Sequence, residues 1–381
     1  MKSISHYKKA IESRAKSFFY ERRGFKTDRH IVVIESDDWG SIRMPSLEIL
    51  HELEEKGIHF FNNFGYDTHD SLASDDDLTV LMDALSSVKD SNGNPAKLTM
   101  NCVVANPDFE KIKNSGFSEY YYELFPDTLR RYPHHDNAFS LWKEGIEKGL
   151  FKPQFHGREH LNVQMWLNLL QKGNLAAIDC FEKGVWSFNL IDRPQGTNHV
   201  LSAYNIQKGD ELKFIEDSVR EGLSLFEKLF GYKSESMIAP NYTWDKTLEA
   251  VAFECGVKVF QGDRTQRLSH FSYQNGGMPI THYMGEKNSL GQVYMIRNCN
   301  FEPNQIKNTT VDSVMAEVKK CFDLHKPAII SSHRQNFIGE LNLTDRDKNI
   351  ITFVDLLNTI VKQYSDIEFM TSVELGQLLS H

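Results

Sequence analysis

Two adjacent aspartates and two histidines four residues apart are the side chains of this chain best suited to act together on a substrate. Asp37 and Asp38 follow an apolar run, and His156 and His160 would share one face of their segment if it turned as a helix. One carboxylate and two imidazoles form a ligand set with open positions, which suits Zn²⁺ or a similar divalent ion. Such an ion lowers the pKa of water toward ~7, and the second aspartate could then act as general base.

These polar residues fall directly after predicted strands. Each of five predicted strands runs into one or two of them: 31–36 into Asp37 and Asp38, 153–155 into His156 and His160, 236–239 into Asn241 and Tyr242, 257–260 into Asp263, and 328–332 into His333. The carboxyl ends of parallel strands meet on one face of a barrel, where active sites gather. The sequence therefore predicts that these side chains share one site.

Composition and charge narrow the class of protein. The chain has 381 residues, of which 40% are hydrophobic and 25% charged, as in ordinary globular proteins. Its net charge of −9 argues against nucleic acid or an anionic membrane as the main partner. Five scattered cysteines without CxxC spacing suit reduced thiols and indicate a cytoplasmic protein. No run approaches the ~20 apolar residues of a membrane span. The oligomeric state is left open.

Alternating strand and helix patterns predict a parallel sheet with helical crossovers. The alternation repeats about seven or eight times, and no linker or low-complexity tract divides it. We therefore expect one barrel-like domain over residues 1–381, with an N-terminal helical extension at 1–28. Residues 268–300 contain glycine turns and are expected to form a β-rich insertion. A doubly wound open sheet is the alternative.

Four motifs resemble those of the polysaccharide deacetylase family, also known as the NodB-homology or carbohydrate esterase 4 family. Residues 35–40, Glu-Ser-Asp-Asp-Trp-Gly, occupy the place of the family's Thr-Phe-Asp-Asp-Gly motif. Residues 156–160 keep the histidine spacing of its second motif. Residues 239–242 correspond to its Arg-Pro-Pro-Tyr loop, and residues 330–333 to a late strand that ends in histidine. Motif order and spacing extend over roughly residues 30–335.

The resemblance implies an irregular (β/α)7-type barrel and assigns roles to five residues. Asp37 would be the general base and His333 the general acid. Asp38, His156 and His160 would hold the metal ion, with Zn²⁺ favoured and Co²⁺, Mn²⁺ or Ni²⁺ as alternatives. The implied activity is removal of acetyl groups from an N-acetylated sugar or polysaccharide.

The chain departs from the family pattern at positions that bear on the substrate. Ala239 stands where the family has the arginine that orients the base, so either Arg158 or Arg334 substitutes for it or the base is tuned differently. Trp39 is inserted before Gly40 and alters the rim. The predicted substrate-binding residues are Trp39, Arg158, Asn241, Tyr242 and Arg334.

Three other functions fit parts of the same pattern. Residues 156–160 match the His-x-x-Glu-His pattern of inverzincin metallopeptidases, with Glu159 as base. Glycine at position 157 weakens the helix that this pattern requires. A glycosidase could use Asp37 or Asp38 with another acid. A barrel that binds carbohydrate without turnover would keep the metal site and release no acetate.

Overall fold

In the computed structural model, the strand that carries the two aspartates lies at the centre of the fold. This strand, β1 (Ile31–Trp39), is buried along its whole length. It pairs in parallel with β13 (Ala328–His333) on one edge and with β2 (Leu98–Cys102) on the other. The start of β1 also pairs with β14 (Glu368–Met370). Because this strand is flanked on both edges and covered on both faces, its first half is an unbroken run of Ile and Val, and the polar residues of its second half are buried as well.

The structure describes residues 19–60, 65–189 and 200–380. No helix in these ranges is long and apolar enough to cross a membrane. Most of the N-terminal extension predicted at 1–28 lies outside the described residues, and of the described part, positions 19–22 are helical.

The sheet forms an irregular (β/α)7-type barrel, as predicted, because one extended segment joins its two ends. The strand order is β10-β11-β7-β6-β5-β2-β1-β13-β12. Although β11 and β12 stand far apart in this order, they are separated in the chain only by Arg297 and Asn298. The segment pairs with β7 through β11 and with β13 through β12, both in parallel. The remaining strands of the described chain are β3 (Ala105–Pro107), β4 (Tyr122–Leu124), β5 (Phe151–Phe155), β6 (Ser236–Ile238), β7 (Val259–Gly262), β8 (Thr265–Gln266), β9 (Ile280–Thr281), β10 (Glu286–Lys287), β11 (Val293–Ile296) and β12 (Cys299–Asn300).

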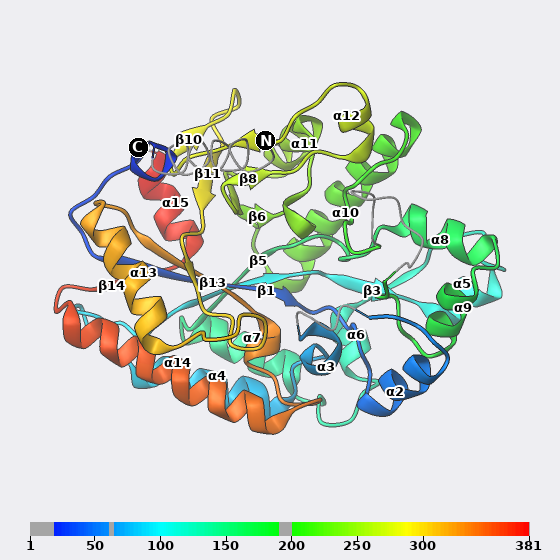
Figure 1. Cartoon of the computed structure of the whole chain (residues 1–381), viewed down its shortest axis with the longest axis horizontal. Helices are drawn as coiled ribbons and strands as arrows, with labels where there is room; N and C mark the ends of the chain where they lie inside the picture. Colours follow the sequence, from blue (N-terminus) through cyan, green and yellow to red (C-terminus); the bar gives the residue numbers. More distant parts are fainter. Residues whose placement is uncertain (1–18, 61–64, 190–199, 381) are drawn as a thin grey trace, which may run out of the picture.

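Helices surround the barrel. In Figure 1, α4, α7 and α14 lie below β1, while α10, α11 and α15 lie above it. A second, smaller apolar cluster joins α2, α5, α8 and α9 near the end of β1. The helices of the described chain are α2 (Leu47–Glu55), α3 (Tyr66–His69), α4 (Asp75–Ser87), α5 (Phe109–Asn114), α6 (Phe125–Leu129), α7 (Ala138–Glu147), α8 (Val163–Gln171), α9 (Leu175–Glu182), α10 (Leu212–Phe230), α11 (Lys246–Glu254), α12 (His270–Gln274), α13 (Val311–Asp323), α14 (Leu343–Gln363) and α15 (Ser372–Ser380), with short 3-10 turns η1 (Gly209–Glu211), η2 (Pro240–Tyr242) and η3 (Arg334–Asn336).

The segment 268–300 is only in part the insertion that the sequence predicts. It contains the helix α12 and the short antiparallel strands β9 and β10. Its end, however, is β11 and β12, which belong to the barrel itself. The glycine turns that precede Val293 favour an insertion outside the barrel. Val293–Ile296, however, is a fully buried apolar run, which is typical of a barrel strand.

Helix α10 packs against the end of β5 so closely that we expect no side chain to be tolerated at Gly222. A Cβ there would lie 2.7 Å from Cζ of Phe155 and 3.0 Å from Cβ of Arg158. We predict that Gly222→Ala lowers the free energy of unfolding by about 1–3 kcal/mol despite the better helix propensity of alanine, because the core is overpacked. Urea denaturation measures this. Ser224→Ala, on an exposed position of the same helix, should cost nothing, and equal stability of both variants would contradict this packing.

Candidate active site

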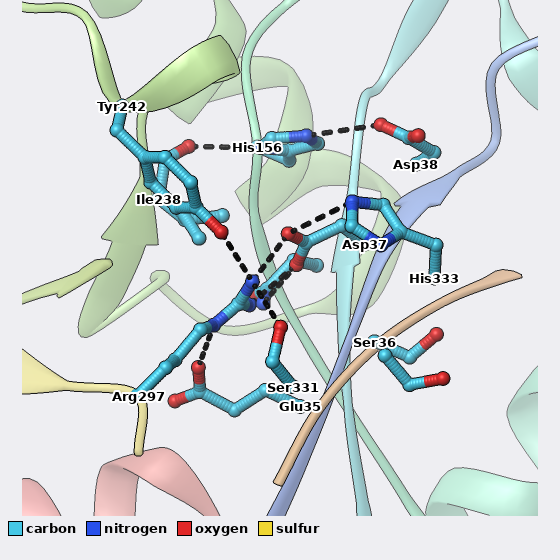
Figure 2. Close-up of polar contacts among 12 residues, drawn as sticks. Glu35, Ser36, Asp37, Asp38, His156, Ile238, Tyr242, Arg297, Ser331 and His333 are labelled. Carbon is cyan, nitrogen blue, oxygen red and sulfur yellow. Dashed lines mark hydrogen bonds and ion pairs between the residues drawn. The ribbon is translucent and has the colours of Figure 1, made fainter. Parts of the chain in front are cut away.

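A bulge in β1 points the two adjacent carboxylates in different directions. The pairing of β1 with β2 shifts its register between Ser36 and Trp39. Within this gap Asp38 has φ 70°, a left-handed conformation that aspartate adopts more readily than most residues. Asp37 therefore faces Arg297, while Asp38 faces His156 (Figure 2). Bulges beside active sites commonly redirect a side chain in this way.

Asp38, His156 and His160 form one buried cluster. Oδ1 of Asp38 lies 3.2 Å from Nε2 of His156 and 3.4 Å from Nε2 of His160. One potential ligand atom from each residue lies within 4.8 Å of the others. The segment 156–160 is not helical, and Gly157 has φ 120°. The histidines therefore converge through a loop and not on the face of a helix.

The hydrogen bonding of this cluster fits a divalent cation. Nδ1 of His156 lies 2.9 Å from the carbonyl oxygen of Ile238, which can only accept, so Nδ1 carries a proton and Nε2 is the nitrogen that can present a lone pair toward Asp38. Burial raises the pKa of Asp38, but the neighbouring charge of Arg43 opposes it, and the pKa lies well below its ordinary value. Burial lowers the pKa of His160 well below 6.5, so this ring is neutral. A lone pair and a carboxylate that face each other are satisfied by a cation between them.

Asp37 is held as a carboxylate by Arg297. Two guanidinium nitrogens of Arg297 donate to the two oxygens of Asp37, both at 2.6 Å, and its Nε donates to Glu35 at 2.6 Å (Figure 2). Asn101 donates a further hydrogen bond to Asp37 at 2.9 Å. Burial raises the pKa of Asp37, yet the charge and hydrogen bonds of Arg297 lower it to about 2. Asp37 is therefore ionised throughout the physiological pH range.

His333 stands directly beside Asp37 because β1 and β13 pair in register at these two residues. Its Nε2 lies 3.9 Å from Oδ2 of Asp37, and its Nδ1 lies 2.6 Å from Oε1 of Glu302. Burial lowers the pKa of His333, but the carboxylate of Glu302 and the two aspartates raise it to about 9. At neutral pH this ring is an imidazolium whose Nε2 proton faces Asp37 (Figure 2).

A row of buried side chains with alternating charges holds Asp38 on the side that faces Arg43. Arg43 donates to Asp38 at 2.9 Å and pairs with Asp70 at 3.0 Å. Asp70 in turn pairs with Arg334 at 2.6 Å. These groups are all buried. Buried charges of this kind need partners of opposite sign, so the row holds the Asp38 carboxylate in place.

The acids and histidines line one cavity of about 360 Å³. Asn241 and Tyr242, two of the predicted substrate-binding residues, line it as well. Both have φ 54°, so the loop after β6 turns sharply at this rim. The hydroxyl of Tyr242 accepts a hydrogen bond from Arg297 at 3.3 Å, which ties the rim to the group that holds Asp37 (Figure 2).

Three predicted substrate-binding residues do not line this cavity. Trp39 enters the core, where its Nε1 donates to Ser36 and its ring packs against Trp142. Arg334 is fully buried and pairs with Asp70. Arg158 pairs with Glu159 and with Glu221, at 2.7 and 2.6 Å. Neither arginine contacts Asp37, so the expectation that one of them replaces the arginine missing at Ala239 is wrong, and Arg297 makes that contact.

The geometry required for the metallopeptidase alternative is absent. Glu159 is buried, and its carboxylate accepts from Arg158, Ser218 and Tyr120. It does not line the cavity between the histidines and Asp38. The residues 156–160 also lack the continuous helix on which that pattern depends. The inverzincin interpretation of these five residues is therefore wrong.

Sequence reasoning missed Arg297, Glu302 and Arg43. A signal existed for Arg297, since it follows directly on the buried run Val293–Ile296, as the other site residues follow their strands. Its backbone N–H donates to the carbonyl oxygen of Gly262 in β7. At this point the segment stops pairing with β7 and begins to pair with β13. Glu302 and Arg43 lie in irregular segments, and no local pattern marks them.

Comparisons with known proteins find likeness at the level of structure. No model of a known protein family matches the chain, and no curated protein matches its sequence. The similar structures include a 4-α-glucanotransferase from Thermococcus litoralis, with 12% identity and a TM-score of 0.44 over 91% of this chain. The chain spans only 40% of that enzyme's length.

Two further similar structures match over most of both chains. A family 4 acetyl xylan esterase from Clostridium thermocellum, solved in complex with a cobalt ion, has 13% identity and a TM-score of 0.38 over 91% of each chain. An allantoinase has 11% identity and a TM-score of 0.41 over 92% of this chain and 90% of its own. At such identities and TM-scores these likenesses carry no functional conclusion, and the chemistry has to be derived from this chain's own residues.

We predict that Arg297→Gln destabilises the protein in a pH-dependent way. At pH 7 the variant leaves two buried carboxylates, Asp37 and Glu35, without their cation, which costs about 3–5 kcal/mol of unfolding free energy. In the wild type, Asp37 has a folded pKa of about 2, below its unfolded value, so its stabilisation is present above about pH 4 and is lost toward pH 2. The difference between the two proteins should therefore shrink as the pH falls from 4 to 2.

Urea denaturation at pH 7 and pH 3 measures both effects. Arg264→Gln is the matched control, because Arg264 forms a long ion pair of 3.9 Å with Glu21 outside the site. A difference between Arg297→Gln and wild type that is equal at both pH values would show that the buried charges are not its cause.

Proposed function

We propose that the chain is a divalent-metal-dependent hydrolase that removes acetyl groups from an N-acetylated sugar or polysaccharide. The observation that carries the proposal is the convergence of two devices on one cavity. The Asp38–His156–His160 cluster could hold an ion with open positions, and the Asp37–His333 pair stands beside it with one group ionised and the other protonated. An amide needs both polarisation of its carbonyl and protonation of its leaving nitrogen, and the two devices supply them.

Asp37 takes the proton from the attacking water. With a pKa of about 2 it is a weak base, so it can accept a proton efficiently only from water that is already acidified. A divalent ion bound by Asp38, His156 and His160 would supply that acidification and would polarise the acyl carbonyl. Arg297 keeps the carboxylate ionised and fixes its orientation with two parallel hydrogen bonds.

His333 holds the proton that the leaving nitrogen needs. Its Nδ1 is engaged by Glu302, so the proton available for transfer is the one on Nε2, which faces the cavity beside Asp37. When this proton is transferred to the nitrogen as the C–N bond breaks, the sugar leaves as a neutral amine and not as an unstable nitrogen anion. Glu302 orients the ring and stabilises the imidazolium.

A carbohydrate-binding barrel without turnover is the second candidate, because Ala239 stands at the place of the family's arginine. The pairing of Arg297 with Asp37 favours the enzyme, since it supplies the cation that this substitution removes. Acetate release decides between the two.

We predict acetate release from one or more members of a panel of N-acetylated sugars and oligosaccharides, with loss of activity on chelation and recovery with Zn²⁺ or Co²⁺. Asp37→Asn should lower kcat by about 10²–10⁴-fold, as expected for loss of a general base, with metal content unchanged. Glu159→Gln is the control and should retain activity. Metal and sugar binding without acetate release would contradict the proposal in favour of the inactive barrel, and cleavage of a glycosidic bond that resists chelation would favour a glycosidase.

The activity should fall at high pH as His333 loses its proton. The pKa of His333 is about 9 in the protein without metal, and a bound cation lowers it because like charges repel. Since the acid is needed protonated, kcat/KM should fall as the pH rises through this value. Glu302→Gln removes the main group that raises this pKa, so the basic limb of the profile should move to lower pH. An unchanged limb in Glu302→Gln would rule out His333 as the acid.

A further inference from the structure

The cations around the cavity differ in whether a carboxylate neutralises them. Arg43 and Arg297 are buried, and each pairs with two carboxylates. Arg267 also lines the cavity, but it is exposed. Among the described residues its guanidinium forms no ion pair, and no acid lies within 4.0 Å of it. Its five N–H donors are therefore available to a molecule in the cavity.

The backbone of Arg267 is fixed to the loop that forms the rim. Its N–H donates to the carbonyl of Tyr242 at 2.8 Å, and its carbonyl accepts from Trp244 at 3.0 Å. Thr243 lies opposite it in a β-bridge. Tyr242 spans from this point to Arg297, the partner of Asp37 (Figure 2). Arg267 thus lies on the same cavity as Asp37 and His333, at a position that is set by backbone hydrogen bonds.

None of the described acids that line the cavity is paired with Arg267. Each acid that lines the cavity already faces a cation of the protein: Asp37 faces Arg297, Asp38 faces Arg43, and Glu302 faces the His333 imidazolium. A divalent ion at Asp38 adds further positive charge. The lining itself balances three acids against Arg43, Arg267 and the His333 imidazolium, so a divalent ion held at Asp38 would make the cavity positive and attractive to anionic molecules.

We propose that Arg267 binds an anionic group, a phosphate or a carboxylate, on the acetylated sugar that enters this cavity. The inference rests on the proposed function and narrows its substrate class to acidic or phosphorylated N-acetylated sugars. A guanidinium matches both groups, since each presents two oxygens to a pair of parallel N–H donors. The cavity of about 360 Å³ is at the small end of the range for sites that hold small organic molecules.

Matched substrates test the proposal. Acetate release is measured with N-acetylglucosamine, its 6-phosphate, its 1-phosphate and the corresponding uronic acid, using the metal-loaded wild type, Arg267→Gln and Arg267→Lys. We expect the wild type to have a higher kcat/KM for an anionic sugar than for the neutral one. Arg267→Gln should remove about 10- to 100-fold of that preference, mainly through KM, and leave the neutral sugar unaffected. Arg267→Lys should restore part of it. The preferred sugar identifies the anionic group.

A control and a binding measurement make each outcome decisive. Arg264→Gln removes a positive charge three positions away, at a residue that lines a different cavity, and should leave the preference unchanged. Calorimetric titration of Asp37→Asn with the same sugars reports binding without turnover. If no sugar is hydrolysed, the proposed function fails, while charge-selective binding lost in Arg267→Gln still supports this inference. Equal kcat/KM and equal binding for neutral and anionic sugars would overturn it, as would a preference that persists in Arg267→Gln, because the metal ion alone would then bind the anion.

Discussion

Two buried carboxylates on consecutive residues repel each other, and the architecture of the site follows from how that repulsion is relieved. The bulge in β1 turns Asp37 and Asp38 toward separate sets of cations. Asp37 receives Arg297, and Asp38 receives Arg43 on one side and lies beside the rings of His156 and His160 on the other. Without this separation one carboxyl would have to keep its proton, as in acid pairs that share a site. The separation allows both to be ionised at once, which a metal ligand and a general base beside it require.

The closure of the barrel supplies the first of these cations. Arg297 lies between β11, which pairs with β7, and β12, which pairs with β13, so the residue that links the two ends of the sheet also reaches Glu35 and Asp37 inside it. The family that the motifs resemble places an arginine on the loop that here contains Ala239. In this chain the guanidinium of Arg297, which lies on the closing segment, contacts Asp37. An equivalent cation can thus reach the carboxylate from a different strand, because all the strands end around one axis.

The sequence predicts the barrel and the positions of five site residues because strand ends are local signals. A buried strand that begins with an apolar run and ends in a polar residue can be recognised without knowing its neighbours, and this holds at Asp37 and His333. Partners that act across the barrel carry no such signal. The pairing of His333 with Glu302 depends on two segments whose contact only the fold defines. The prediction that Trp39 binds substrate fails for a different reason. A tryptophan next to site residues suggests a binding surface, but the bulge turns this side chain into the core.

The environments of Asp37 and His333 push their pKa values far apart. Arg297 lowers the pKa of Asp37 to about 2, and Glu302 raises that of His333 to about 9. Between these limits Asp37 is ionised and His333 protonated in most molecules, which is the state that the proposed mechanism requires of its base and its acid. The cost is a base too weak to deprotonate ordinary water. A site with this pair therefore needs a cation beside it to acidify the water, and the Asp38–His156–His160 cluster lies where such a cation would act.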